Sequence, residues 1–164
     1  MAFARSRTLR GAVAGAAAAA VWLAQQPFDK RLFRCGYDDA ELLGRLAGDG
    51  GQALGALLHV QNGALFGALY ANVAPSLPFP PPLRGPLAAL AEHVATWPAM
   101  ALASPRLALN PRAFLQATWR HLLFGAVLGE LERRLNTPAE LKPVSEEAVA
   151  SNGHGSAAHL VAAP

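Results

Sequence analysis

Two stretches of the sequence decide the expected fold: HVQNGALFGALYA at residues 59–71 and HLLFGAVLGELER at residues 121–133. Each stretch begins with a histidine, reaches Gly-Ala after three residues, and places a further glycine and leucine at the same spacing. Apolar residues with glycines one helical turn apart are typical of a helix that packs closely against a neighbour. The sequence therefore predicts two equivalent helices, each with an imidazole at its head.

A second, shorter match precedes each of these stretches. Residues 9–14 read LRGAVA and residues 83–88 read LRGPLA, so each Leu-Arg-Gly start is followed by one histidine-headed helix. A Leu-Arg-Gly segment and a histidine-headed segment therefore follow each other twice along the chain. Such self-similarity indicates a duplicated unit, and here the unit would be a pair of helices. The sequence therefore predicts an all-α chain of two tandem helical hairpins that share one orientation.

The composition suggests an apolar environment for these helices. Hydrophobic residues make up 52% of the 164 residues and charged residues only 15%, against roughly 25% charged residues in an ordinary globular domain. Four apolar segments each approach the roughly 20 residues needed to cross a bilayer: 9–26, 53–74, 85–103 and 113–131. We therefore expect residues 1–136 to form an integral membrane four-helix bundle, and residues 137–164 to form a disordered tail.

A multi-pass membrane protein has the lipid bilayer as its partner, and the charges flanking the first segment suggest its orientation. Three arginines precede that segment, which favours a cytoplasmic N-terminus: Arg5, Arg7 and Arg10. A cleaved signal peptide is the weaker reading, because no clear small-x-small site lies before Pro27. A water-exposed bundle would need polar outer faces, which GALFGALYANVA at residues 63–74 does not offer.

Several function classes lack their sequence signals. The formal charge of +3 comes without a dense Lys/Arg cluster, so we expect no nucleic-acid partner. Cys35 is the only cysteine, which excludes an intramolecular disulfide and a cysteine-based metal motif. No Gly-x-Ser-x-Gly or phosphate-binding glycine loop occurs, so we expect no enzyme, and no metal or other cofactor.

Small residues one turn apart predict where the helices meet. Close backbone approach at such positions drives helix association where lipid leaves no hydrophobic force between helices. The glycines expected to pack helices together are Gly11, Gly15, Gly63, Gly67, Gly125 and Gly129. A ladder of alanines from Ala91 to Ala103 would do the same in the third segment. Glycine or alanine positions that no helix of the same chain contacts would allow a second copy of the chain to pack there as a homo-oligomer.

The glycine-bearing face also carries the histidines. His59 and His121 lie four residues before the first glycine of their stretches, on the same side of the helix. Both imidazoles should therefore point into the bundle. Ionisable groups inside a membrane are costly and are usually functional. The predicted intramembrane polar site comprises His59, Glu92, His93, His121, Gln25 and Asn62.

Several motifs resemble those of the YagU-type bacterial inner-membrane proteins, a family of unknown function. HVATWPAM at residues 93–100 resembles the family's His-x3-aromatic-Pro-x-Met stretch, and a histidine-headed helix carrying Tyr70 is also similar. The final span, with His121 ahead of Glu130, matches in the same way. The resemblance implies a multi-pass protein of the bacterial inner membrane, and it implies no reaction. Gln25 and Gln26 replace charged residues that the family carries late in its first span.

Three readings of the histidines stay open from the sequence. They could be neutral groups that hold the helices together, or they could line a path for protons or a small polar solute, because histidine titrates near neutral pH. Alternatively, His59 and His121 could be axial ligands of a haem, or could join His93 in a metal site. A membrane-embedded hydrolase is the remaining enzyme alternative. A non-enzymatic protein whose histidines pack the bundle or line a polar site is the favoured interpretation.

Overall fold

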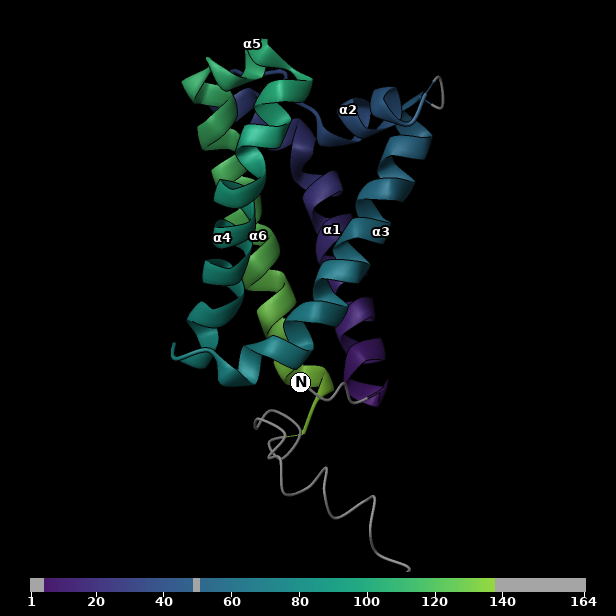
Figure 1. Ribbon diagram of the computed structural model, residues 1–164, viewed down its shortest axis with the longest axis vertical. Helices are drawn as coiled ribbons and strands as arrows, with labels where there is room; N and C mark the ends of the chain where they lie inside the picture. The colour runs from purple at the N-terminus through teal and green to yellow at the C-terminus, as the bar shows by residue number, and fades with distance from the viewer. Residues whose placement is uncertain (1–4, 49–50, 138–164) are drawn as a thin grey trace, which may run out of the picture.

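The chain is all-helical over the residues that the computed structural model describes, 5–48 and 51–137. Four long helices alternate in direction along the longest axis of the molecule, and short helices lie near one end (Figure 1). The helices are α1 (Arg5–Phe33), α2 (Asp39–Leu46), α3 (Gly51–Val73), the 3-10 turn η1 (Ala74–Ser76), α4 (Pro81–Ala103), α5 (Pro105–Ala108) and α6 (Pro111–Leu135).

The long helices pack as two pairs, α1 with α3 and α4 with α6, and the contact between α1 and α6 joins the pairs. α2 packs against the first part of α3, at the end of the molecule where α5 also lies (Figure 1). The start of α1 and the end of α6 lie together at the opposite end (Figure 1). This arrangement leaves the middle of the molecule enclosed by all four long helices.

The first pair is held at glycines. A Cβ built at Gly15 would lie 2.0 Å from the carbonyl oxygen of Gly63, and one built at Gly11 would lie 2.4 Å from the carbonyl oxygen of Gly67. Real Cβ atoms do not approach backbone that closely, so only glycine permits this separation of α1 and α3. These contacts are the close approach that the spacing of the glycines predicts.

The second pair meets at the equivalent glycines. Cβ atoms built at Gly85 and Gly125 would lie 2.1 and 2.4 Å from the carbonyl oxygen of the other residue. Gly129 has more room, since its Cβ would first meet the Tyr70 hydroxyl at 3.4 Å. Both pairs of long helices therefore cross at glycines that occupy matching positions in the two histidine-headed stretches.

The predicted alanine ladder of the third segment is wrong. In α4 the buried face runs through Gly85, Ala89 and His93, whereas Ala91 and Ala95 are exposed. Ala91 follows Ala89 by two residues, and two residues rotate a side chain by about 200° around a helix with 3.6 residues per turn. The alanines therefore lie on the face opposite the one that packs against α6.

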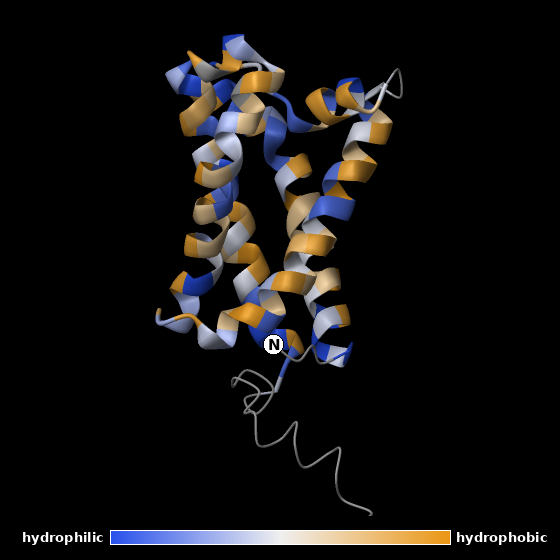
Figure 2. Cartoon of the chain, viewed as in Figure 1, coloured by the Kyte–Doolittle hydropathy of each residue, from blue (hydrophilic) through white to orange (hydrophobic). Residues whose placement is uncertain are grey.

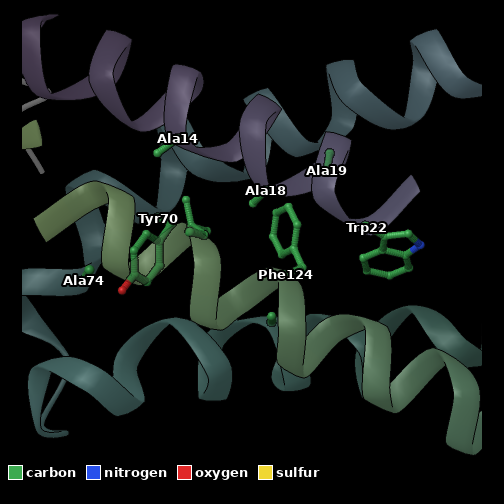
Figure 3. Packing of buried hydrophobic residues seen from close by; sticks show 9 residues of the cluster. Ala14, Ala18, Ala19, Trp22, Tyr70, Ala74 and Phe124 are labelled. Carbon is green, nitrogen blue, oxygen red and sulfur yellow. The ribbon is translucent and has the colours of Figure 1, made fainter. Parts of the chain in front are cut away.

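The core between α1 and α6 combines small and aromatic residues. Ala14, Ala18 and Trp22 form one stripe of α1 at four-residue spacing and are at most 4% exposed. Phe124 of α6 lies beside this stripe, and Tyr70 of α3 lies farther along the same cluster (Figure 3). Alanines on α1 leave room for the aromatic rings of the neighbouring helices, so a helix of low hydropathy still makes a packed core.

The helices extend beyond the predicted segments. α1 passes through Pro27 to Phe33, although an internal proline removes one backbone hydrogen bond. The link between the second and third predicted segments contains η1 and the first turn of α4. Pro81 opens α4, where its missing N–H costs nothing. The extension of α1 matters most for the candidate site, because it carries Asp29.

The expectation of a multi-pass inner-membrane protein is wrong. Within the described ranges no helix combines the length and the apolar character required to cross a membrane. The long helices have the length, but polar side chains interrupt them, and hydrophilic and hydrophobic residues alternate along their courses (Figure 2). Glu92 and His93 interrupt α4, and Gln116, Arg120 and His121 interrupt α6. The predicted spans therefore have no support. The cytoplasmic N-terminus and the bilayer partner were inferred from those spans and lose their support with them.

Two further expectations are not decided. The predicted tail lies outside the described residues except for Thr137, and so do its histidines at positions 154 and 159. The homo-oligomer stays a prediction.

The glycine contacts give a direct test. We expect Gly15→Ala to lower the free energy of unfolding by about 1–3 kcal/mol, because its methyl group overlaps backbone of α3 that must then shift. Gly36→Ala is the matched control, since a Cβ there meets no atom within 4 Å. Thermal and denaturant unfolding of the purified variants measures both changes. Equal stability of the two variants would contradict the close crossing of α1 and α3.

Candidate functional site

A buried ion pair joins the first and last long helices. Arg120 of α6 donates from Nε to Asp29 Oδ2 at 2.6 Å and from Nη2 to Asp29 Oδ1 at 2.7 Å. Both side chains are fully buried. Asp29 also accepts from Gln25 at 2.5 Å and from Gln116 at 2.6 Å. Four N–H groups therefore donate to one buried carboxylate, so each of its oxygens accepts two hydrogen bonds.

The same guanidinium binds a second carboxylate at the start of α2. Arg120 Nη1 donates to Asp39 Oδ2 at 2.7 Å, and Nη2 also donates to the carbonyl oxygen of Tyr37 at 3.1 Å. Asp39 accepts two more hydrogen bonds, from Trp22 Nε1 at 3.0 Å and from the Tyr37 hydroxyl. All three nitrogens of the guanidinium are therefore engaged with protein oxygens.

Neighbouring charges fix the segment between α1 and α2. Asp38 caps α2 by accepting from the amide of Glu41 and pairs with Lys30 at 2.5 Å. Burial alone would raise the pKa of Asp38, but these bonds hold it below its ordinary value. Burial and the adjacent Asp39 raise the pKa of Tyr37 well above 10. Tyr37 therefore stays a hydroxyl donor at every physiological pH.

The Arg120 network forms one wall of a cavity. The larger of two adjoining cavities has a volume of about 160 Å³ and the smaller about 100 Å³. Trp22, His59, Glu92 and His121 line both, so α1, α3, α4 and α6 all contribute. The larger cavity is completed by Tyr37, Asp39, Leu43, His93, Thr96, Trp97, Met100 and Ala117.

His121 and Glu92 lie next to each other in the wall of these cavities. His121 Nδ1 lies 2.7 Å from the carbonyl oxygen of Ala117, which can only accept, so Nδ1 carries a hydrogen. His121 Nε2 lies 3.0 Å from Glu92 Oε2, within the distance of an ion pair. α4 and α6 therefore place an imidazole nitrogen beside a carboxylate oxygen at the cavities.

His93 is a neutral imidazole beside this pair. It stacks on His121 with ring centroids 4.5 Å apart, and it is 2% exposed. Burial and the neighbouring His121 lower its pKa to about 4. The Thr118 hydroxyl donates to the carbonyl of Phe114, so His93 Nε2, at 3.1 Å from the Thr118 oxygen, must be the donor. Its Nδ1 is then an unprotonated acceptor nitrogen.

His59 faces the same cavities from α3. Its ring contacts Trp22 edge-on at 4.9 Å, and Trp22 makes a similar contact with His121 at 4.6 Å. Burial lowers the pKa of His59, which favours the neutral ring. Its Nε2 is buried and has no hydrogen-bond partner in the structure. A buried polar atom without a partner is costly, and it is a position where a bound molecule would supply the missing bond.

The structure brings most of the predicted site residues together. His59, Glu92 and His121 line both cavities, His93 lines the larger and Asn62 the smaller. Gln25 does not line either cavity: it donates to Asp29 and accepts from the Trp119 indole at 3.3 Å. It supports the Arg120 network instead.

The sequence reasoning missed the charged half of the site. Asp29 and Asp39 lie outside the four predicted apolar segments, and Arg120 is not among the predicted site residues. One signal was present: Gln116 and Arg120 lie four residues apart within an otherwise apolar stretch, and therefore on one helix face. A polar stripe on a packed helix indicates a buried partner elsewhere in the chain.

The geometry does not fit the metal and haem readings. The described part of the chain holds no group of three or more histidine, cysteine, aspartate or glutamate side chains arranged to bind a metal ion. His59 and His121 each contact the Trp22 ring edge-on, at 4.9 and 4.6 Å. The two cavities are also smaller than the roughly 300–1,000 Å³ typical of drug-sized ligand and cofactor pockets.

No family model, curated protein or solved structure matches this chain. The resemblance to YagU-type proteins therefore stays a prediction from the motifs.

Removing the central cation should unfold the protein more readily. We expect Arg120→Met to lower the free energy of unfolding by about 3–5 kcal/mol, because Asp29 and Asp39 would remain buried without their cation. Arg134→Met is the control, since its ion pair with Glu130 is exposed, and we expect a loss below about 1 kcal/mol. Equal losses measured by denaturant unfolding would contradict the assigned network.

The depressed pKa of His93 predicts a pH dependence of stability. The folded protein releases the His93 proton near pH 4, whereas the unfolded chain releases it near 6.5. The unfolded state therefore binds more protons between these values, so the His93 contribution to stability is lost as the pH falls from about 6.5 towards 4. A ring titration followed by NMR should show a His93 midpoint near 4. A midpoint near 6.5 would contradict its burial.

Proposed function

We propose that this chain is a non-enzymatic binding protein that holds a small polar solute in the cavities between α1, α3, α4 and α6. One observation carries the proposal. His59, Glu92 and His121, which are far apart in the sequence, converge from three helices on the same open volume, and His59 Nε2 is buried beside it without a partner. The cavities supply acceptors and aromatic surface that a solute could contact.

The chemistry of the lining favours binding over covalent reaction. Neither cavity is lined by a serine, cysteine or lysine among the described residues, and these are three of the side chains that serve as nucleophiles. The hydroxyl of Thr96 donates to the backbone carbonyl of Glu92 rather than to a base. Cys35 is buried beside Tyr37 and lines neither cavity.

A second candidate function is proton exchange with the bound solute. Glu92 Oε2 lies 3.0 Å from His121 Nε2, and His93 stacks on His121. A solute that titrates could therefore exchange a proton with Glu92 or His121, and the charge of that pair would change by one unit as the charge of the solute changes by one unit in the opposite direction. The histidines would then serve both as packing groups for Trp22 and as lining of the polar site.

Filling the larger cavity tests the proposal. The probes are neutral, cationic and anionic solutes of about six heavy atoms, because a cavity near 150 Å³ holds a molecule the size of benzene. We expect at least one class to shift the NMR signals of the Trp22 indole and the His59 ring. Leu43→Phe should abolish the shift, because Leu43 lines the larger cavity.

Leu46→Phe is the matched control for that experiment. Leu46 lies on the same helix but is 61% exposed and lines neither cavity. Binding in this variant should equal that of the unaltered protein. The proposal would be overturned if no class of solute perturbed the cavity signals, or if Leu43→Phe and Leu46→Phe bound equally well.

A further inference from the structure

We infer that the solute is a small protonated amine, a cation with alkyl groups and at least one N–H. This inference rests on the proposed function, since it names the class of molecule that the cavity would bind. Three features support it: an unbalanced negative charge beside the cavity, aromatic surface in its wall, and hydrogen-bond acceptors on the residues that line it.

The charge imbalance arises in the network behind the cavity wall. Three carboxylates share two cations there: Asp29, Asp38 and Asp39 with Lys30 and Arg120. Glu92 adds a further carboxylate at the cavity, and its Oε2 lies 3.0 Å from His121 Nε2. The carboxylates therefore outnumber the lysine and arginine cations beside the cavity, and a bound cation would relieve that imbalance.

Asp39 presents this charge to the ligand. Its side chain is 11% exposed and lines the larger cavity, whereas Asp29 is fully buried behind it. Arg120 cannot attract an anion in compensation, because its three nitrogens are engaged with Asp29, Asp39 and the carbonyl of Tyr37. No lysine or arginine lines either cavity in the described part of the chain. The electrostatic field in the cavity therefore favours a cation over an anion.

The aromatic lining suits an alkylammonium ion. Trp22, Tyr37 and Trp97 line the larger cavity, and the sulfur-bearing side chain of Met100 lies beside them. Trp97 is held in place by edge-on contacts with Tyr37 at 6.5 Å and with His93 at 5.4 Å. The faces of such rings attract cations whose methyl groups lower the cost of leaving water.

Acceptors in the wall call for at least one N–H on that cation. His59 Nε2 is buried without a partner, and the pKa of the ring is lowered, so a neutral His59 can present this nitrogen as an acceptor. Glu92 lines both cavities and keeps one carboxylate oxygen beyond the one that meets His121. An ammonium N–H could donate to the Glu92 carboxylate directly, and to His59 Nε2 after a shift of the ring, whereas a fully alkylated ammonium could donate to neither.

The test compares probes of similar size on the unaltered protein. They are trimethylammonium, tetramethylammonium, tert-butanol and trimethylacetate, added as titrations followed through the Trp22 indole and His59 ring signals by NMR. We expect trimethylammonium to bind about tenfold or more tightly than neutral tert-butanol, because it gains the ring and carboxylate attractions. Tetramethylammonium should bind more weakly than trimethylammonium, since it has no N–H.

One pair of variants locates the cation. Glu92→Gln should weaken trimethylammonium binding by about tenfold and leave tert-butanol binding nearly unchanged, because it removes charge but keeps the shape of the side chain. Glu41→Gln is the matched control: it removes an exposed carboxylate of α2 that lines neither cavity, and binding should not change.

The outcomes separate the two proposals. If tert-butanol or trimethylacetate binds at the cavity as tightly as trimethylammonium, the cation inference is overturned while the binding function stands. Equal losses of affinity in Glu92→Gln and Glu41→Gln would also overturn it. If none of the probes, charged or neutral, perturbs the cavity signals, the cation inference fails. The proposed binding function fails as well only when the wider solute panel gives the same result.

Discussion

The guanidinium of Arg120 is the group on which the rest of the structure depends. A buried cation is stable only when each of its donors meets an acceptor, and here α1, α2 and the segment before α2 all supply acceptors. Asp29 reaches Arg120 only because α1 continues through Pro27, and Asp39 reaches it only because the chain turns back after Phe33. One ion thus fixes the relative positions of α1, α2 and α6.

The candidate site is a consequence of that constraint. Asp39 Oδ2 accepts hydrogen bonds from both Arg120 and Trp22, so the network that stabilises the fold also orients an aromatic wall of the cavity. The glycine crossings act with it, because they bring α3 and α4 close to their partners and so bring His59 and Glu92 to the centre. The residues that stabilise the fold therefore also position the residues that line the cavity.

The sequence predicted what depends on local spacing. Helical periodicity gave the all-α class and placed the four long helices, and the four-residue spacing put His59 and His121 on the glycine-bearing faces that turn inward. Arg120 and Asp29 are 91 residues apart, and no local rule pairs them. The expectation of membrane spans failed because alanine and glycine were read as apolar span residues, whereas here they permit close helix contacts around buried polar groups.

The central claim is that Arg120 and Asp39 act together as one buried charged unit. A double-mutant cycle tests it most directly, with unfolding free energies measured for Arg120→Gln, Asp39→Asn and the double variant. We predict a coupling energy of roughly 1–3 kcal/mol, as expected for directly paired buried groups. Additivity of the two losses within about 0.5 kcal/mol would show that the groups do not interact and would contradict this account.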